Sequence, residues 1–286
     1  MTTDITTAKT QFVAFLKSKK RAQATVIAYT KDIDQMLQYV KHAGKLTVDT
    51  IEKAELEAFL KKMGSDNYTP KSISRKINSM KTFFRYCKSE HIIDTDPAST
   101  LEHPKFESKP PRILSRMEYR ALRDTCRGDV RMYAIVEIFL QTGIRIGELA
   151  SLTLEDVKDS ELFIKAQEGH AERFVPLNKA GKEALKRYLD ARDVHAKSNA
   201  LFVTKTGKSL LIRNIRTAID RYFRLAGIEG AKVNDLRHTF IAHHLMAGTP
   251  ITTLSKLVGH KRISTTEKYL ELVKGQKIDT IKLGEL

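Results

Sequence analysis

QTGIRIGELASL, residues 141–152, is the stretch that says most about how this chain of 286 residues folds. The apolar run before it, residues 130–142, predicts a buried helix, and Arg145 follows that helix closely. The two glycines of GIRIG, residues 143–147, do not make a dinucleotide-binding fingerprint, because a third glycine and a preceding strand are missing. The stretch therefore predicts a helix end beside an arginine, which either caps the helix or belongs to a site.

The sequence around this stretch predicts a mixed, mainly helical domain. Residues 162–177 alternate as a β-hairpin, with LFIKAQ and ERFVPL on either side of the turn EGHA. Apolar periodicity predicts helices at 116–127, 130–142, 179–191, 212–226, 235–247 and 252–258, and a last one that contains Tyr269. The predicted fold class is mainly α with a small β-sheet (α+β).

The segment HPKFESKPPR, residues 103–112, divides the chain into two domains. Its three prolines hold their neighbours extended, which suits a linker and not a helix. Residues 1–102 are predicted to form a helical bundle, with helices at 7–17, 22–40, 53–63 and 70–88. Residues 113–286 form the second predicted domain.

The helix predicted at 70–88 has two different faces. Its apolar stripe consists of Ile73, Ile77, Met80, Phe84 and Cys87. The opposite face carries no acid and consists of Lys71, Ser74, Arg75, Asn78, Lys81, Thr82 and Arg85. Solvated faces usually mix charges of both signs, so we interpret Lys71, Arg75, Asn78, Lys81 and Arg85 as DNA contacts. A merely solvated helix face is the alternative.

The charge of the chain points to a polyanionic partner. Its net charge is +16 and its pI is about 9.7, which favours nucleic acid or an anionic membrane surface. No apolar stretch is long enough to span a bilayer, and the N-terminus lacks the pattern of a signal peptide. Cys87 and Cys126 form neither a disulfide framework nor a metal cluster. The sequence thus predicts a soluble, reduced, cytoplasmic protein.

The patterns of several cofactor-dependent enzymes are missing. The chain has no P-loop, and RHTFIAHH, residues 237–244, lacks the spacing of a zinc protease. Carboxylates spaced to hold two Mg²⁺ ions are also missing. We therefore expect no metal and no cofactor, and any cleavage of DNA would need protein cations and a side-chain nucleophile.

Four segments of the C-terminal half contain such groups. Arg145 lies in TGIRIGEL, Arg237 in DLRHTF, His260 in LVGH and Tyr269 in STTEKY. In order and spacing these segments resemble the signatures of the tyrosine recombinases, the integrase family. The resemblance covers nearly the whole chain and is closest to compact Xer-like and transposon-borne members, which implies a chain that starts at its core-binding domain.

The resemblance implies a catalytic role for each of the four residues. Arg145 and Arg237 would bind the non-bridging oxygens of one phosphate, and His260 would donate a further hydrogen bond. Tyr269 would attack phosphorus, leaving a 3′-phosphotyrosyl link and a free 5′-hydroxyl. Two nearby guanidiniums are expected to make the phenolate of Tyr269 more accessible. Glu148 and His238 are interpreted as structural neighbours.

The sequence departs from the family pattern at two positions. Family members carry a lysine in the hairpin turn that protonates the leaving oxygen, and here that position is Glu168. Lys165, three residues earlier, would reach the site only through a bulge. The family's usual His or Lys before the second arginine is Asn234, which can hydrogen-bond a phosphate but carries no charge.

The resemblance implies a C-shaped clamp of two domains that performs site-specific recombination on double-stranded DNA as a tetramer. The tail LELVKGQKIDTIKLGEL, residues 270–286, is amphipathic and is expected to pack in a groove of the neighbouring protomer; packing on its own domain is the alternative. Other possible functions are DNA binding with weak or no catalysis, and nicking and closing like a type IB topoisomerase. The tail argues against the latter.

Overall fold

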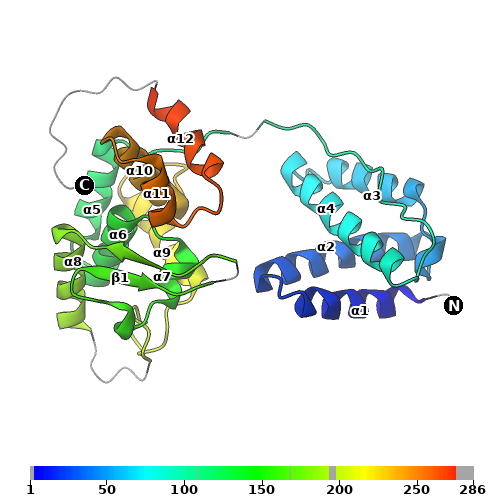
Figure 1. The fold of residues 1–286 in the computed structure, drawn as a ribbon, viewed down its shortest axis with the longest axis horizontal. Coiled ribbons are helices and arrows are strands. Elements are labelled where there is room, and N and C mark those ends of the chain that lie inside the picture. The colour runs from blue at the N-terminus through cyan, green and yellow to red at the C-terminus, as the bar shows by residue number, and fades with distance from the viewer. Residues whose placement is uncertain (1–2, 108, 168, 193–197, 275–286) are drawn as a thin grey trace. The chain divides into compact units, whose positions relative to one another are not determined.

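The computed structural model describes residues 3–107, 109–167, 169–192 and 198–274, and the chain divides into two compact units, residues 1–108 and 109–286 (Figure 1). Each unit has its own hydrophobic core. The division falls within the predicted linker, whose two ends each contact one unit. His103 Nδ1 lies 2.9 Å from Ser74 Oγ in the first unit, and Arg112 donates to Glu118 over 2.5 Å in the second.

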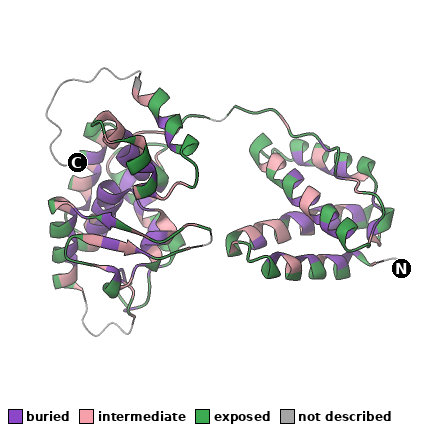
Figure 2. Cartoon of the chain, viewed as in Figure 1, coloured by how far each residue is buried: buried purple, intermediate pink, exposed green. Residues whose placement is uncertain are grey.

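The first unit is a helical bundle. Its described elements are α1 (Ile5–Ser18), α2 (Gln23–His42), the 3₁₀ turn η1 (Val48–Thr50), α3 (Lys53–Ser65) and α4 (Pro70–Ser89). The Thr69 hydroxyl caps α4 by accepting from the Ser72 N–H, and Pro70 fits the first turn, where no N–H is needed. The buried sides of the helices face one another within the unit (Figure 2).

A buried ion pair joins α2 to α4. Lys76 is 2% exposed and its Nζ lies 2.9 Å from Asp32 Oδ1, while Ser79 donates to Oδ2 over 2.9 Å. Arg75 donates to the same carboxylate. The apolar stripe predicted for α4 is buried except Ile73, which is half-buried. The sequence interpretation missed Lys76, because a lysine inside the stripe was not expected to find a buried acid 44 residues away.

The second unit is mainly helical with a two-stranded sheet. Its described elements are α5 (Arg116–Cys126), α6 (Val130–Thr142), α7 (Ile146–Ser151), η2 (Leu154–Asp156), β1 (Glu161–Ile164), β2 (Arg173–Pro176), α8 (Lys179–Ala191), α9 (Ile212–Leu225), α10 (Val233–Met246), α11 (Ile251–Val258) and α12 (Ser264–Lys274). The mainly helical class with a small sheet is confirmed. Within the described residues, no helix is long and apolar enough to cross a membrane.

The hairpin is shorter than the sequence pattern predicted. Strands β1 and β2 pair antiparallel with Leu162 opposite Val175, and both side chains are buried in the core. Lys165 lies just beyond β1, and the arms meet again at an isolated bridge between Gln167 and His170. The regular pairing of the two strands therefore ends before the turn.

The turn between α6 and α7 depends on Gly143. Gly143 ends α6 in the left-handed conformation, with φ of 59°. A Cβ at this position would collide with the ring of Phe240 on α10, so glycine is required by both the backbone and the packing. Two residues later Arg145 begins α7, a short helix that the sequence interpretation missed.

Candidate active site

The C-terminal end of α11 gathers three arginines from three other parts of the second unit. The last carbonyls of a helix have no partner within the helix, and here guanidiniums supply one. The contacts are Arg173 Nε to Leu257 O, Arg237 Nη2 to Val258 O and Arg145 Nη2 to Gly259 O, each 2.7 Å. Three arginines from distant parts of the sequence thus meet at the end of α11. The partial negative charge of this helix end stabilises their positive charges.

Glu148 on α7 holds two of these arginines. Arg173 donates to both of its oxygens over 2.9 and 2.8 Å, and Arg145 Nη1 donates to Oε1 over 2.9 Å. Glu148 is 3% exposed; burial acts to raise its pKa, but the hydrogen bonds from Arg173 and from the Arg145 N–H lower it to about 2. Glu148 is therefore ionised at neutral pH and fixes the planes of both guanidiniums.

Arg237 on α10 is the most buried of the three arginines, at 5% exposure. It donates to Gly143 O over 2.5 Å as well as to Val258 O, but to no carboxylate of the residues that the structure describes. Burial and the nearby Arg145 lower its pKa to about 9, so it stays charged at neutral pH at a cost to the fold. Glu148 thus pairs with two of the three guanidiniums gathered here, and the excess positive charge favours an anion.

His260 follows α11 and faces the same cluster. Its Nδ1 lies 2.8 Å from the hydroxyl of Thr266, which is fully buried. Burial, followed by Arg237 and Arg145, lowers the His260 pKa to about 4, so the imidazole is neutral at neutral pH. When Thr266 donates to Nδ1, the other nitrogen carries the hydrogen and can donate to a bound anion.

Tyr269 on α12 packs beside His260 in the same unit. The two ring centroids are 6.5 Å apart, and Tyr269 is 6% exposed within an apolar cluster that includes Phe240 and Leu254. Burial raises its pKa, and Arg237 acts in the opposite direction with a smaller effect. The expectation that the guanidiniums make the phenolate accessible is therefore wrong for the protein without DNA, because loss of hydration outweighs their attraction.

Asn234 and His238 lie one turn apart on α10. Asn234 is exposed, and its Nδ2 is 3.2 Å from His238 Nε2. The His238 ring is 5.9 Å from the ring of Tyr269, and its Nδ1 is 3.3 Å from Asp235 Oδ1. His238 thus lies next to both Asn234 and Tyr269. Across the described residues, no three His, Cys, Asp or Glu side chains are grouped to hold a metal ion.

Lys165 is not brought into this cluster. Its ammonium lies 3.0 Å from Asp156 Oδ2 and 3.3 Å from Thr153 Oγ1. The hairpin does open after β1, but Lys165 contacts η2 and not the end of α11. Glu168, the residue at the family's lysine position, lies outside the described residues.

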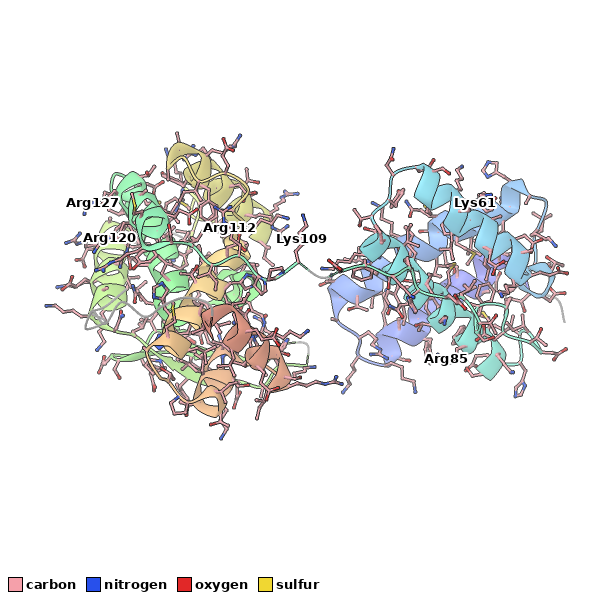
Figure 3. The ribbon with its side chains drawn as sticks, turned by 90° about the horizontal axis from the view of Figure 1, so that it is seen from above. Lys61, Arg85, Lys109, Arg112, Arg120 and Arg127 are labelled. Carbon is pink, nitrogen blue, oxygen red and sulfur yellow. The ribbon has the colours of Figure 1, made fainter. Side chains whose placement is uncertain are left out.

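Of the residues predicted to contact DNA, Lys71, Asn78 and Arg85 are exposed and Lys81 is half-exposed (Figure 3 labels Arg85). Arg75 is also exposed, but its guanidinium is bound to Asp32. The exposed face of α4 is therefore basic, but one of its cations has an acidic partner. That partner, Asp32, comes from α2 and not from α4 itself.

Sequence reasoning missed Arg173 and Thr266. Arg173 holds Glu148 and Leu257 O, and the only signal was a cation at the start of an otherwise apolar strand. Thr266 lies in the STTEKY segment but offered no sign of contact with His260, because the loop between them is not periodic.

Comparison with known proteins agrees with this arrangement. Residues 112–275 match the "Phage integrase family", and residues 10–91 match "Phage integrase, N-terminal SAM-like domain". The chain is 31% identical over 280 residues to tyrosine recombinase XerD of Oceanobacillus iheyensis, covering 94% of each chain. It is 29% identical over 274 residues to tyrosine recombinase XerC of Thermodesulfovibrio yellowstonii, covering 91% of this chain and 90% of that one.

Two solved structures show the same fold. A lambda integrase dimer bound to a COC′ core site superimposes with a TM-score of 0.78 at 16% identity, covering 99% of this chain and 81% of that one. The XerA recombinase superimposes with a TM-score of 0.54 at 26% identity, covering 93% of each chain.

Proposed function

This chain belongs to the phage integrase family, and from that premise we propose that it is a site-specific DNA recombinase whose nucleophile is Tyr269. The observation that carries the proposal is the meeting of Arg145, Arg237 and His260 at the end of α11, with Tyr269 packed beside His260. Residues more than 120 positions apart in the sequence meet in one cationic site with a tyrosine packed beside it. A merely structural cluster has no need of unmatched charge beside a tyrosine.

Binding of a DNA phosphate would relieve the charge excess of the site. Arg145 and Arg237 present forked donors that match phosphate oxygens, and neutral His260 adds one donor. Arg173 remains bound to Glu148 and so acts through the position of Arg145 rather than on DNA. These contacts strengthen as charge builds on the phosphoryl oxygens in the transition state.

Cleavage then proceeds by attack of Tyr269 Oη on phosphorus. A bond forms between Oη and phosphorus while the bond from phosphorus to the 5′ oxygen breaks, giving a 3′-phosphotyrosyl link and a 5′-hydroxyl. Because burial keeps the phenol protonated in the free protein, proton loss accompanies the attack. The ester link conserves the bond energy, so a 5′-hydroxyl from a partner strand can rejoin the DNA without ATP.

The first unit would hold DNA through the exposed face of α4, and recombination would take place in a tetramer on two sites. One solved lambda integrase structure is a tetramer bound to a Holliday junction. The predicted role of the tail in assembly stays a prediction, because residues 275–286 lie outside the described part of the chain. Deleting 276–286 should impair assembly on DNA more than binding to a single site, as measured by native gels.

The Tyr269→Phe variant tests the proposed chemistry. A DNA site is first selected from a random-sequence pool by binding to this variant, and nicked suicide duplexes are built from the selected sequence. We expect wild type to form a covalent adduct on a denaturing gel, and Tyr269→Phe to bind equally well without forming one. An adduct that persists in Tyr269→Phe, or tight binding with no adduct from wild type on any nicked duplex, would contradict the proposal and favour a binding-only protein.

A further inference from the structure

Lys261 places an ammonium over the hairpin turn. It follows His260 directly, and a Cβ built on Gly169 would lie 2.5 Å from its Nζ. Gly169 itself has φ of 85° and lies between the two residues that bridge the hairpin arms, Gln167 and His170. The side chain of Lys261 therefore extends from the end of α11 to the backbone of the turn.

The surroundings of Lys261 connect it to the phosphate site. His170, in the same turn, has its pKa lowered by burial, by Arg145 and by Lys261, so these cations lie within electrostatic range of one imidazole. His170 in turn is one of the groups that lower the pKa of His260. Lys261 is exposed and has no carboxylate partner in the part of the chain that the structure describes. Within the described residues it is thus an unpaired cation beside the hairpin turn, close enough to act on His170.

The reaction proposed above needs a proton for the leaving group. An expelled 5′ alkoxide is strongly basic, and a positioned acid that protonates it as it leaves accelerates such a step by about 10²–10⁴-fold. The donors inside the cluster are less suited to this step, because Arg145 and Arg237 are engaged by carbonyls at the end of α11 and His260 is neutral.

We propose that Lys261 is the general acid, donating a proton from Nζ to the departing 5′ oxygen. This inference rests on the proposed function of the site. As Tyr269 Oη bonds to phosphorus, the phenolic proton passes to water, the bond from phosphorus to the 5′ oxygen breaks, and that oxygen takes the proton of Lys261. The ammonium becomes an amine, and it regains a proton when the 5′-hydroxyl of an incoming strand attacks.

Two other groups are less suited. Lys165 was the candidate from the sequence, but its ammonium is engaged by Asp156, which is 4% exposed. His170 lies in the right turn, but the same cations that would bind the phosphate disfavour its protonated form. Lys261 extends to the turn and has no carboxylate partner among the described residues.

A substrate with sulfur in place of the bridging 5′ oxygen tests this role, because a thiolate leaves without protonation. The nicked duplexes selected with Tyr269→Phe are made with oxygen or sulfur, and adduct formation is timed for full-length wild type, Lys261→Ala, Lys261→Arg, Lys165→Ala and Arg262→Ala. Lys261→Arg keeps the charge but is a poor acid. Arg262→Ala removes a neighbouring exposed cation and controls for loss of DNA affinity.

With oxygen, we expect Lys261→Ala and Lys261→Arg to be slower than wild type by about 10²–10³-fold, and both to recover to within about tenfold with sulfur. Arg262→Ala and Lys165→Ala should cleave both substrates at nearly the wild-type rate. The inference is overturned if Lys261→Ala is equally slow on both substrates, which indicates a binding role, or if it matches wild type on oxygen. Failure of wild type on both substrates would instead contradict the recombinase function.

Discussion

Each unit of this protein has a buried carboxylate that several cations surround, Asp32 in the first and Glu148 in the second, and the two clusters differ in the charge that remains unmatched. In the first unit, the Asp32 carboxylate accepts hydrogen bonds from Lys76, Arg75 and Ser79. Lys76, the more buried of the two cations, pairs with it directly. In the second unit, Glu148 accepts from Arg145 and Arg173, while the buried Arg237 donates to backbone carbonyls and, among the described residues, to no carboxylate. The cluster around Asp32 has its charges matched in the folded protein. The cluster around Glu148 keeps an excess positive charge until an anion binds.

We infer from this difference that the matched charges stabilise the fold, whereas the unmatched charge serves the reaction. Breaking a matched buried pair leaves an ion without its partner and costs stability. Removing an unmatched cation relieves repulsion instead, so its loss should be seen in function and not in folding. The two clusters are therefore expected to respond in opposite ways to mutation.

The largest effect is expected for Arg237→Gln. It should reduce the rate of adduct formation by about 10⁴-fold, equal to about 5.5 kcal/mol of transition-state stabilisation, because a buried guanidinium on the phosphoryl oxygens is lost. The free energy of unfolding should change by no more than about 1 kcal/mol, since burial and Arg145 already disfavour this charge. Adduct timing and urea denaturation measure the two quantities. Arg224→Gln, an exposed arginine on α9, is the control. A large loss of stability in Arg237→Gln would remove the distinction between the clusters.

Asp32→Ala should show the reverse pattern. It leaves Lys76 buried without a carboxylate, which should destabilise the first unit by about 3–5 kcal/mol. Hydrogen exchange on the full chain would detect this as lost protection in α2 and α4, with the second unit unchanged. Asp34→Ala is the matched control, because its ion pair with Lys9 is half-exposed and should be worth less than about 1 kcal/mol. Equal protection in both variants would show that the buried pair contributes little.

Glu148 should make the stability of the second unit depend on pH. A carboxyl pKa of about 2, against the ordinary value of 4.5, corresponds to about 3 kcal/mol in favour of the fold. Because the folded-state pKa is the lower one, this stabilisation is complete above about pH 4.5 and is lost as the pH falls toward about 2. Glu148→Gln should flatten that part of the stability profile, whereas Glu155→Gln, an exposed carboxyl, should leave it unchanged. Denaturation across this pH range checks the sign, and a profile that stays steep in Glu148→Gln would assign the loss to other groups.

How much of this the sequence could predict depends on the range of the interactions. The stripe of α4 and the helix that ends before Gly143 follow from neighbours a few residues apart, and periodicity predicts them. The roles of Arg145, Arg237, His260 and Tyr269 came from their resemblance to a family and not from spacing alone. The contacts of Lys76 with Asp32, and of Lys261 with the hairpin turn, join elements far apart in the chain. No local pattern records them, because they depend on which helices pack together.

The smallest effect is predicted for Arg75, the exposed cation that pairs with Asp32. The prediction concerns whether Arg75 also binds DNA. Arg75 and Arg85 are both exposed on α4, but among the residues that the structure describes only Arg75 has a carboxylate partner (Figure 3 labels Arg85). A cation already matched by Asp32 displaces fewer counterions on binding DNA than a free one. Arg85→Ala should therefore reduce the slope of log K against log salt by about 0.9, and Arg75→Ala by clearly less. Fluorescence anisotropy with a labelled duplex over a series of KCl concentrations measures both slopes. Equal reductions would mean that Arg75 leaves Asp32 for the phosphate, in which case Lys76 and Ser79 alone complete the cluster when DNA is bound.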